Sequence, residues 1–301
     1  MARILASDGM EKSAVDKLTS LGHEVVMQFY EPDDLAQQVK NFDVLVVRSA
    51  TKVRAPVIDA AAETGKLKLI LRGGVGVDNI DVAYAQSKGI KVNNTPMASS
   101  AAVAELVIGH MFCLARFIHI ANVTMRDGKW NKKDYEGIEL AGKTLGLMGI
   151  GRIGRNVADR AACIGMKVIY TEHPSFVPND DVYKRVTADE LIAQADFISL
   201  HMPKLNNPVL TAHEFEKMKD GVYIINAARG GLVVEDDLIA ALDSGKVAGA
   251  ALDVFTEEPT KNEKLYTHPK VSVTPHIGAS TAEAQSRIGE EIVSQILDMF
   301  K

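Results

Sequence analysis

The chain has 301 residues, of which 47% are hydrophobic and 24% charged, an ordinary globular composition with enough length for two domains. A formal net charge of −5 argues against broad binding to nucleic acid or to an anionic membrane surface. The N-terminal apolar run is too short for a signal peptide, stretch 106–115 is too short to span a bilayer, and both cysteines lie in apolar runs typical of reduced core positions. We therefore expect a cytoplasmic protein that binds neither nucleic acid nor membrane.

Strand and helix patterns alternate along the first third of the chain. We expect strands at 3–6, 24–27, 44–47, 67–70 and 90–92, and helices at 11–21, 33–40, 56–63 and 80–87. Such alternation is typical of a parallel sheet covered by helices. One long helix is then expected over 99–126, with Ser99 or Ser100 as its N-cap.

A glycine-rich segment, Gly149-Ile-Gly-Arg-Ile-Gly154, occupies the middle of the chain. An expected strand at 144–148 precedes it, a helix at 155–163 follows, and a strand at 167–170 then leads to Glu172. This order is the dinucleotide-binding fingerprint, in which the three glycines permit a tight turn, approach of a pyrophosphate and packing of helix on strand. Glu172 is placed to accept hydrogen bonds from a ribose diol. The alternative is a tight turn in an ordinary α/β domain, with Glu172 at a solvated strand end.

The alternation resumes after Glu172. We expect strands at 196–200, 222–225, 247–251 and 271–273, and helices at 188–194, 211–218, 234–244 and 280–299. The expected fold is α/β with two doubly wound parallel-sheet domains. A Rossmann dinucleotide-binding domain (97–278) is nested within a flavodoxin-like substrate domain (1–96 and 279–301), with a ligand cleft between them.

Three further segments place a reactive side chain at the end of a strand. Arg229 follows one strand at a glycine turn, where a guanidinium can grip a carboxylate in bidentate fashion. Glu258 follows the next strand, and His276 follows a third beside a proline, where a nearby carboxylate would raise the pKa of an acid–base histidine. Taken singly, each has a plain alternative, namely a surface ion pair, a solvated loop residue and a structural histidine. No metal-ligand spacing occurs among the histidines, so no metal site is expected.

Four motifs occur in order along the chain. They are GIGRIG at 149–154, NAARGGLV at 226–233, ALDVFTEEP at 251–259 and TPHIGASTAEAQ at 274–285. With RSATKV from Arg48 and RGGVGVDNID from Arg72, the chain resembles the D-isomer-specific 2-hydroxyacid dehydrogenase family over essentially its whole length. Within that family it resembles the branch of D-3-phosphoglycerate dehydrogenases. The resemblance implies that Arg229 anchors the substrate, that His276 transfers the proton and that Glu258, which directly precedes a proline, rather than Glu257 orients His276.

The resemblance also implies NAD as the cofactor. The residues it places at the cofactor are Val75, Gly149, Gly151, Arg152, Ile153, Gly154, Glu172, Met202, Ala227, Ala228, Arg229, Asp253, His276, Gly278 and Ala279. Glu172 favours NAD because it would repel the 2′-phosphate of NADP, although His173 beside it would soften that preference. The segment from His201 to Asn207 departs from the family pattern near Met202.

The stretch from Arg48 to Arg72 contains six basic residues against two acidic ones, in a chain that is acidic overall. Such a cation cluster is what a substrate carrying an additional phosphate needs, and a basic outer face is the plain alternative. Arg48, directly after an expected buried strand, is the best phosphate ligand. By resemblance, the backbone of Gly74, Val75 and Gly76 would hold the substrate carboxylate. Lys132, near Trp130 in a segment that resembles a dimer interface, would reach the phosphate of a neighbouring subunit.

The expected activity is therefore NAD-dependent oxidation of 3-phosphoglycerate to 3-phosphohydroxypyruvate, in serine synthesis, by a homodimer. Because the chain ends soon after His276, we expect a short form without a regulatory domain and without feedback inhibition by serine. One alternative is a reductase of glyoxylate, hydroxypyruvate or another D-2-hydroxy acid. A second, of another class, is an NADH-responsive scaffold resembling the C-terminal binding corepressors.

Overall fold

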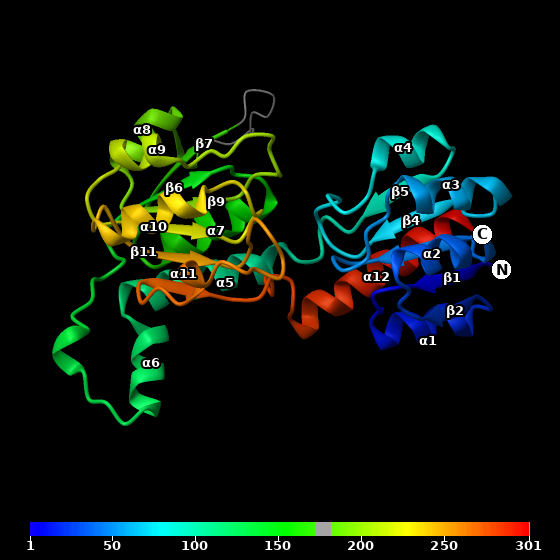
Figure 1. Ribbon diagram of the computed structural model, residues 1–301, viewed down its shortest axis with the longest axis horizontal. Helices are drawn as coiled ribbons and strands as arrows, with labels where there is room; N and C mark the ends of the chain where they lie inside the picture. Colours follow the sequence, from blue (N-terminus) through cyan, green and yellow to red (C-terminus); the bar gives the residue numbers. More distant parts are fainter. Residues whose placement is uncertain (173–181, 301) are drawn as a thin grey trace. The chain divides into compact units, whose positions relative to one another are not determined.

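The computed structural model describes residues 1–172 and 182–300, and the chain divides into two compact units. The first unit combines Met1–Ser99 with Ala279–Lys301, and the second is Ser100–Gly278. Because two separate segments build the first unit, the second is inserted into it along the chain (Figure 1).

The first unit contains a five-stranded sheet of parallel strands in the order β2-β1-β3-β4-β5. Its strands are β1 (Arg3–Ala6), β2 (Glu24–Met27), β3 (Val44–Val47), β4 (Leu69–Arg72) and β5 (Lys91–Asn94). Its helices are α1 (Lys12–Ser20), α2 (Pro32–Gln38), the 3-10 turn η1 (Val39–Asn41), α3 (Ala55–Thr64), α4 (Val82–Ser87) and α12 (Ala282–Met299). In this flavodoxin-like order, successive strands are added on one side of β1 and then on the other, which makes a switch point between β1 and β3. Ligands bind at the carboxyl ends of the strands at such a point.

Two apolar clusters sandwich this sheet. On one face, Leu45, Ile70 and their neighbours pack against α2 and α3. On the other face, Ile4 and Val46 pack against α1 and α12, and α12 approaches α1 so closely that a Cβ on Gly289 would lie 2.9 Å from Cβ of Ala14. The C-terminal helix is thus part of the core of the first unit.

The second unit contains a seven-stranded parallel sheet in the order β12-β11-β10-β9-β6-β7-β8. Its strands are β6 (Thr144–Met148), β7 (Lys167–Thr171), β8 (Lys184–Arg185), β9 (Phe197–Leu200), β10 (Val222–Asn226), β11 (Val247–Leu252) and β12 (Val271–Val273). Its helices are α5 (Ser100–Ala115), α6 (Ile118–Arg126), η2 (Lys132–Asp134), α7 (Arg152–Cys163), α8 (Ala188–Gln194), α9 (Ala212–Lys217), α10 (Glu235–Asp243) and α11 (Glu263–Tyr266). The switch point of this sheet lies between β6 and β9.

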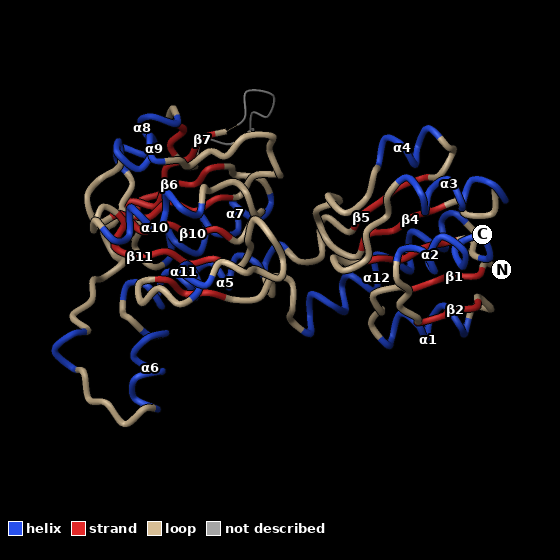
Figure 2. Tube along the Cα trace, in the orientation of Figure 1, coloured by secondary structure: helices blue, strands red, loops and turns tan. Residues whose placement is uncertain are grey.

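Helices cover both faces of this sheet (Figure 2). The cluster on one face includes Val107 and Met111 of α5 with Val157 of α7. The cluster on the other includes Leu191 of α8 and Leu238 of α10. Two all-parallel, doubly wound sheets confirm the expected α/β fold.

The single helix expected over 99–126 is wrong, because α5 and α6 are separate helices with a bend of 66° between them. Phe117 adopts a left-handed conformation with φ 54°, which ends α5. The released carbonyl of Ala115 accepts a hydrogen bond of 2.9 Å from the N–H of Ile138, and a side chain on Gly137 would collide with that carbonyl. A distant segment therefore caps α5 in place of the next helical turn.

Smaller differences concern strand ends. The expected strand 67–70 is β4, which lies two residues later, because pairing with β3 begins at Leu69 and continues to Arg72. The short elements β8 and α11 were not expected from the sequence. Among the described residues no single helix is long and apolar enough to cross a membrane, and only the bent pair α5 and α6 meets those criteria together.

Candidate active site

The glycine turn between β6 and α7 has the local geometry that a dinucleotide requires. Gly149 has φ 100°, and a Cβ there would lie 2.5 Å from the carbonyl oxygen of His201. A Cβ on Gly154 would collide with the carbonyl of Gly149, so the helix packs directly on the turn. At Gly151, by contrast, a Cβ would meet none of the described atoms within 4 Å, which leaves the turn open to a pyrophosphate. The residues present thus fit the cofactor, and the N-terminus of α7 begins at Arg152 and Ile153.

The acidic residue of the fingerprint lies beside this turn. Glu172 follows β7, and its Oε1 accepts a hydrogen bond of 2.5 Å from the N–H of Ile150. On the other side, desolvation lowers the pKa of His201 to about 4, so its ring is neutral and shares a 2.9 Å hydrogen bond with Ser199. Met202 follows His201 and packs partly buried against the sheet. His173 lies outside the described residues.

Replacing Glu172 by alanine is expected to reduce the preference for NADH over NADPH, because the carboxylate that repels a 2′-phosphate is removed. The measurement is kcat/KM with each coenzyme at a fixed substrate concentration. Asp220→Ala, at a carboxylate that is 92% exposed in another loop, is the matched control and should leave the ratio unchanged. An unchanged ratio in Glu172→Ala would contradict the assignment of Glu172 to the ribose.

Arg229 lies in a turn held by a buried asparagine. Asn226, the last residue of β10, is 2% exposed and bonds both sides of the turn. Its Nδ2 donates to the carbonyl of Arg229 at 2.9 Å, and its Oδ1 accepts from the N–H of Ala228 at 3.1 Å. The guanidinium of Arg229 donates to the carbonyl of Ala228 at 2.5 Å. The segment Ala227–Ala228–Arg229 is therefore fixed at the carboxyl end of β10.

His276 and Glu258 form a hydrogen-bonded pair. Nδ1 of His276 donates to Oε2 of Glu258 at 2.7 Å, and Oε1 of Glu258 accepts from the N–H of Phe255 at 3.1 Å. The side chains are 37% and 36% exposed, so the pair is reachable from solvent although one imidazole nitrogen is engaged. Nε2 of His276 is left as the atom that can exchange a proton with a ligand.

The charge of this pair is set by its surroundings. Burial alone would raise the pKa of the Glu258 carboxyl, but His276, the N–H of Phe255 and the charge of Arg229 together lower it. Glu258 is therefore ionised near neutral pH, and its carboxylate can accept from Nδ1 of His276. Glu258 and Arg229 are close enough to interact electrostatically, which brings the predicted catalytic residues together.

Asp253 fixes the turn that carries His276. It is 1% exposed, and its Oδ1 accepts from Thr274 Oγ1 at 2.6 Å and from the N–H of Ile277 at 2.8 Å. Its Oδ2 accepts from the N–H of Gly278 at 2.9 Å, and a Cβ on Gly278 would lie 3.1 Å from that oxygen. The structure thus gives Asp253 a positioning role, and its expected contact with the cofactor stays a prediction.

These residues follow adjacent strands. Along β12, β11, β10, β9, β6 and β7, the residues at the carboxyl ends are His276, Asp253, Arg229, Met202, Gly149 and Glu172. A single edge of one sheet thereby presents all of them. Ala279, also expected at the cofactor, is the first residue of the C-terminal segment of the other unit, where its carbonyl accepts from Gln285 at 2.8 Å.

The first unit brings its own candidate residues to its switch point. Arg48 follows β3, and its N–H donates to Asp8 Oδ2, after β1, at 2.6 Å. Asn79 Nδ2 donates to the carbonyls of Arg48 and Thr51 at 2.8 and 2.7 Å. Cγ of Arg48 would lie 3.7 Å from a Cβ on Gly73, so Arg48 lies beside the glycine turn after β4.

That turn contains Gly74, Val75 and Gly76. Gly74 has φ 146°, and Asn94 Nδ2 donates to the carbonyl of Val75 at 2.5 Å. In the described part of the chain, no protein acceptor is found for the N–H groups of Val75 and Gly76. These two groups can therefore donate to an anionic ligand.

Lys132 is exposed in η2, on the arm that α6 and the following loop form beyond the body of the second unit (Figure 1). No contact between Lys132 and the other candidate residues is found among the described residues. Its predicted role toward a partner subunit stays a prediction.

Sequence reasoning missed Asn226 and Asp8 as supporting residues. Each lies at or just after the end of a strand, as the recognised site residues do, and that position was the available signal. Among the described residues, no group of three or more histidine, cysteine or acidic side chains is arranged to hold a metal.

A nucleotide-binding edge combined with a His–Glu pair and an arginine defines the class of nicotinamide-dependent dehydrogenases. The comparisons give the family. Residues 108–278 match the family model described as D-isomer specific 2-hydroxyacid dehydrogenase, NAD binding domain. The chain belongs to the D-isomer specific 2-hydroxyacid dehydrogenases, and it is an NAD-dependent 2-hydroxyacid oxidoreductase.

Individual relatives support the same family. The chain is 47% identical over 300 residues to hydroxypyruvate reductase of Thermotoga maritima, covering 98% of this chain and 97% of that protein. It is 45% identical over 307 residues to human D-3-phosphoglycerate dehydrogenase, covering all of this chain but only 57% of that protein. Among solved structures, the TT0316 protein from Thermus thermophilus superposes with a TM-score of 0.90 at 34% identity, covering 98% of this chain and 96% of that one.

The resemblance stated from the motifs is thereby confirmed, as is the expectation of NAD as cofactor. The glycine segment is a nucleotide fingerprint and not an ordinary turn. The relatives differ in the substrates that their names give, so the particular substrate of this chain is a separate question.

Proposed function

We propose that the chain is a cytoplasmic D-3-phosphoglycerate dehydrogenase that converts 3-phosphoglycerate to 3-phosphohydroxypyruvate in serine synthesis. The single observation that carries the proposal is the position of Arg48 at the switch point of the first unit, beside the turn of Gly73 to Gly76. A cation next to free backbone N–H groups suits a substrate with both a phosphate and a carboxylate.

The residues of the chain divide the work of the reaction. Arg229 binds the substrate carboxylate and the oxygen at C2, and His276 Nε2 removes the hydroxyl proton in oxidation or returns it in reduction. Glu258 orients His276 through Nδ1 and stabilises its protonated form. NAD, when bound at the glycine turn, supplies the hydride acceptor.

The decisive assay follows NADH oxidation with phosphohydroxypyruvate, hydroxypyruvate and glyoxylate. We expect the highest kcat/KM with phosphohydroxypyruvate. Replacing Arg48 by alanine is expected to raise the KM for phosphohydroxypyruvate about 10- to 100-fold, the worth of one hydrogen bond to a charged group, and to leave hydroxypyruvate unaffected. Lys68→Ala, at an exposed lysine of the same basic stretch, is the matched control.

Reduction of unphosphorylated hydroxypyruvate is the second candidate, supported by the similarity to the Thermotoga protein over nearly the full length of both chains. Equal kcat/KM for phosphohydroxypyruvate and hydroxypyruvate, with no effect of Arg48→Ala, would favour this second candidate and reject the phosphorylated substrate. No turnover of any 2-oxo acid would favour the NADH-responsive scaffold.

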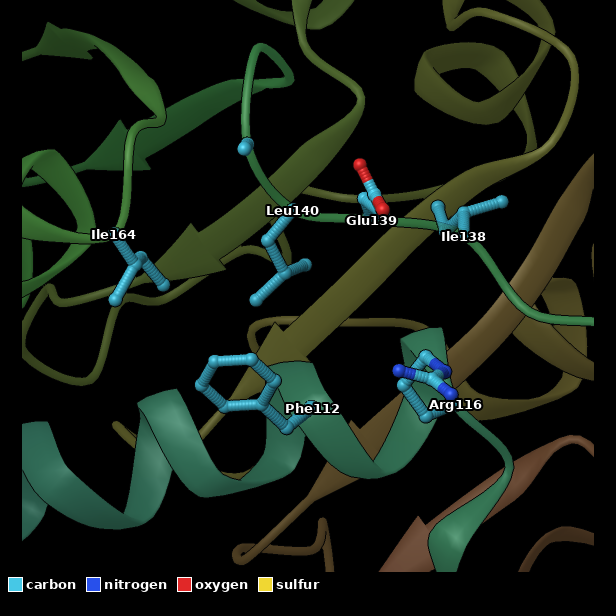
Figure 3. A pocket seen from close by; sticks show the side chains of 7 residues that line it. Phe112, Arg116, Ile138, Glu139, Leu140 and Ile164 are labelled. Carbon is cyan, nitrogen blue, oxygen red and sulfur yellow. The ribbon is translucent and has the colours of Figure 1, made fainter.

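We also propose that the protein is a homodimer whose interface includes the arm. Apolar side chains stand exposed there, with Val123 at 53%, Met125 at 51% and Trp130 at 78%. In the same unit, a hollow of about 270 Å³ lies between α5 and the segment before β6. Figure 3 shows Phe112 and Arg116 on the helix facing Ile138 to Leu140 across it. Exposed apolar surface of this kind suits a second copy of the chain.

Substituting Trp130 by serine together with Met125 by lysine is expected to shift the protein from dimer to monomer. Light scattering coupled to size-exclusion chromatography measures the mass against the 32.6 kDa of one chain. Leu21→Lys, at an exposed leucine of the first unit, is the control and should stay dimeric. A wild-type mass of one chain would reject the proposed dimer.

A further inference from the structure

A buried histidine connects to the turn that carries His276. His110 lies on α5 and is 4% exposed. Its Nδ1 is 3.3 Å from Ser272 Oγ and its Nε2 is 3.1 Å from Thr274 Oγ1, both from the β12 region. Thr274 Oγ1 is in turn 2.6 Å from Asp253 Oδ1. Four side chains from three parts of the second unit thus form one continuous chain of hydrogen bonds.

The direction of each hydrogen bond follows from the carboxylate at its end. The carboxyl oxygens of Asp253 accept from the hydroxyl of Thr274 and from two backbone N–H groups, so the single hydroxyl proton of Thr274 points to Asp253. Thr274 Oγ1 must then accept from His110, which places the proton of the neutral ring on Nε2. Nδ1 is left to accept from the hydroxyl of Ser272. Desolvation lowers the pKa of His110, and the charge of His119 lowers it further. Asp253 raises it by less, so the pKa is lowered overall and the ring is neutral near pH 7.

The last link of the chain acts on the backbone around His276. His276 has φ 53°, a left-handed conformation that non-glycine residues rarely adopt. The hydrogen bonds from Ile277 and Gly278 to Asp253 hold the following peptide groups and thereby stabilise that conformation. The orientation of the Asp253 carboxylate therefore determines where the imidazole of His276 lies.

We propose that His110 is a positioning residue for the dehydrogenase reaction. Through its Nε2–H it orients the hydroxyl of Thr274 toward Asp253, and Asp253 then holds the turn in which His276 meets Glu258. The role depends on the acid–base function proposed for His276. His110 itself lies in the core behind the site and acts only through Thr274 and Asp253.

The kinetic test replaces His110 by methionine, which has a similar volume but cannot donate or accept at these positions. We expect kcat to fall about 10- to 100-fold, the cost of a small misplacement of a catalytic group, with the KM for NADH unchanged. His110→Gln, which can still donate to Thr274, is expected to recover most of kcat. His23→Met is the matched control, because His23 is a buried histidine (6% exposed) of the other unit, and it should change thermal stability without changing kcat.

A double-mutant cycle shows whether His110 acts through Thr274. Thr274→Val removes the hydroxyl, and the double variant with His110→Met should lose little more kcat than the worse single variant. Losses that multiply independently would overturn the proposal, as would a normal kcat in His110→Met. A loss of thermal stability in His110→Met with unchanged kcat would assign His110 a purely structural role.

A spectroscopic test does not depend on turnover. In protein with ¹⁵N-labelled histidine, long-range ¹H–¹⁵N correlation should show the ring of His110 as the neutral Nε2–H tautomer at pH 7, assigned by its loss in His110→Gln. A neutral Nδ1–H tautomer or an imidazolium would overturn the proposal. If the wild type reduces no 2-oxo acid, the proposed function fails. The tautomer of His110 still shows whether the chain of hydrogen bonds runs from His110 through Thr274 to Asp253.

Discussion

Replacing His276 by glutamine is expected to lower kcat about 10²- to 10⁴-fold, the range that general acid–base catalysis contributes. Glutamine retains a donor that can reach Glu258 but cannot exchange a proton in the reaction. Because the glycine turn and Glu172 are separate from this side chain, the affinity for NADH should be preserved. Stopped-flow reduction of the preferred 2-oxo acid measures kcat, and quenching of Trp130 fluorescence or calorimetry measures coenzyme binding.

Glu258→Gln tests the same pair from its other member. The carboxylate of Glu258 accepts from His276 Nδ1, and this hydrogen bond helps to hold the pKa of Glu258 below its usual range. Glutamine keeps an oxygen acceptor for Nδ1 but carries no charge, so kcat should fall about 10-fold at neutral pH, where the wild-type carboxylate is ionised. As the pH falls through the lowered pKa of Glu258, the wild type loses the same charge, and the two rates should approach each other.

These two variants distinguish proton transfer from simple packing. If His276→Gln kept a kcat within a few-fold of the wild type, another group would have to handle the proton and the mechanism would be rejected. If Glu258→Gln lowered kcat equally at every pH, Glu258 would act through its position and not through its charge. Glu257→Gln, at the neighbouring acid that instead pairs with Lys261, is the control for both measurements.

Much of the fold and the site could be predicted from the sequence because the signals were local. Alternating apolar runs indicated the strands, and the glycine spacing indicated the nucleotide turn. Arg229 and His276 could be singled out because each lies three residues after the end of a strand, and parallel strands bring their carboxyl ends to one edge. The choice of Glu258 as the partner of His276 could not be made from spacing alone and came from the family motifs.

The remaining features depend on contacts between distant segments. The break between α5 and α6 has no proline or glycine to mark it, since it results from Phe117 and from the N–H of Ile138, which bonds the end of α5. The chain from His110 to Asp253 joins residues that are 164 positions apart at the Thr274 link. Burial of Asp253 likewise becomes visible only when β11 and β12 pair. Such features require the folded structure.

Arg229 is the second position where a large effect is expected. Arg229→Gln should lower kcat/KM for the 2-oxo acid about 10²- to 10³-fold, the typical loss when a group that stabilises developing oxyanion charge is removed. The effect should fall on both KM and kcat, because the same guanidinium binds the carboxylate and the oxygen at C2. Arg229→Lys is expected to recover only part of this loss, since an ammonium lacks the planar fork that engages two oxygens.

The electrostatic coupling of Arg229 to Glu258 gives this prediction a second, independent readout. The positive charge of Arg229 helps to lower the pKa of Glu258, so its removal should raise that pKa. As Glu258 then loses its charge at a higher pH, activity should decline earlier on acidification in Arg229→Gln than in Arg229→Lys. Added guanidinium should restore part of the kcat/KM of Arg229→Gln, and Arg185→Gln, at an exposed arginine of β8, should change neither rate nor pH profile. Two results together would contradict this role: an unchanged pH profile in Arg229→Gln and no rescue by guanidinium. Arg229 would then not interact with the His276–Glu258 pair and would only hold the turn after β10.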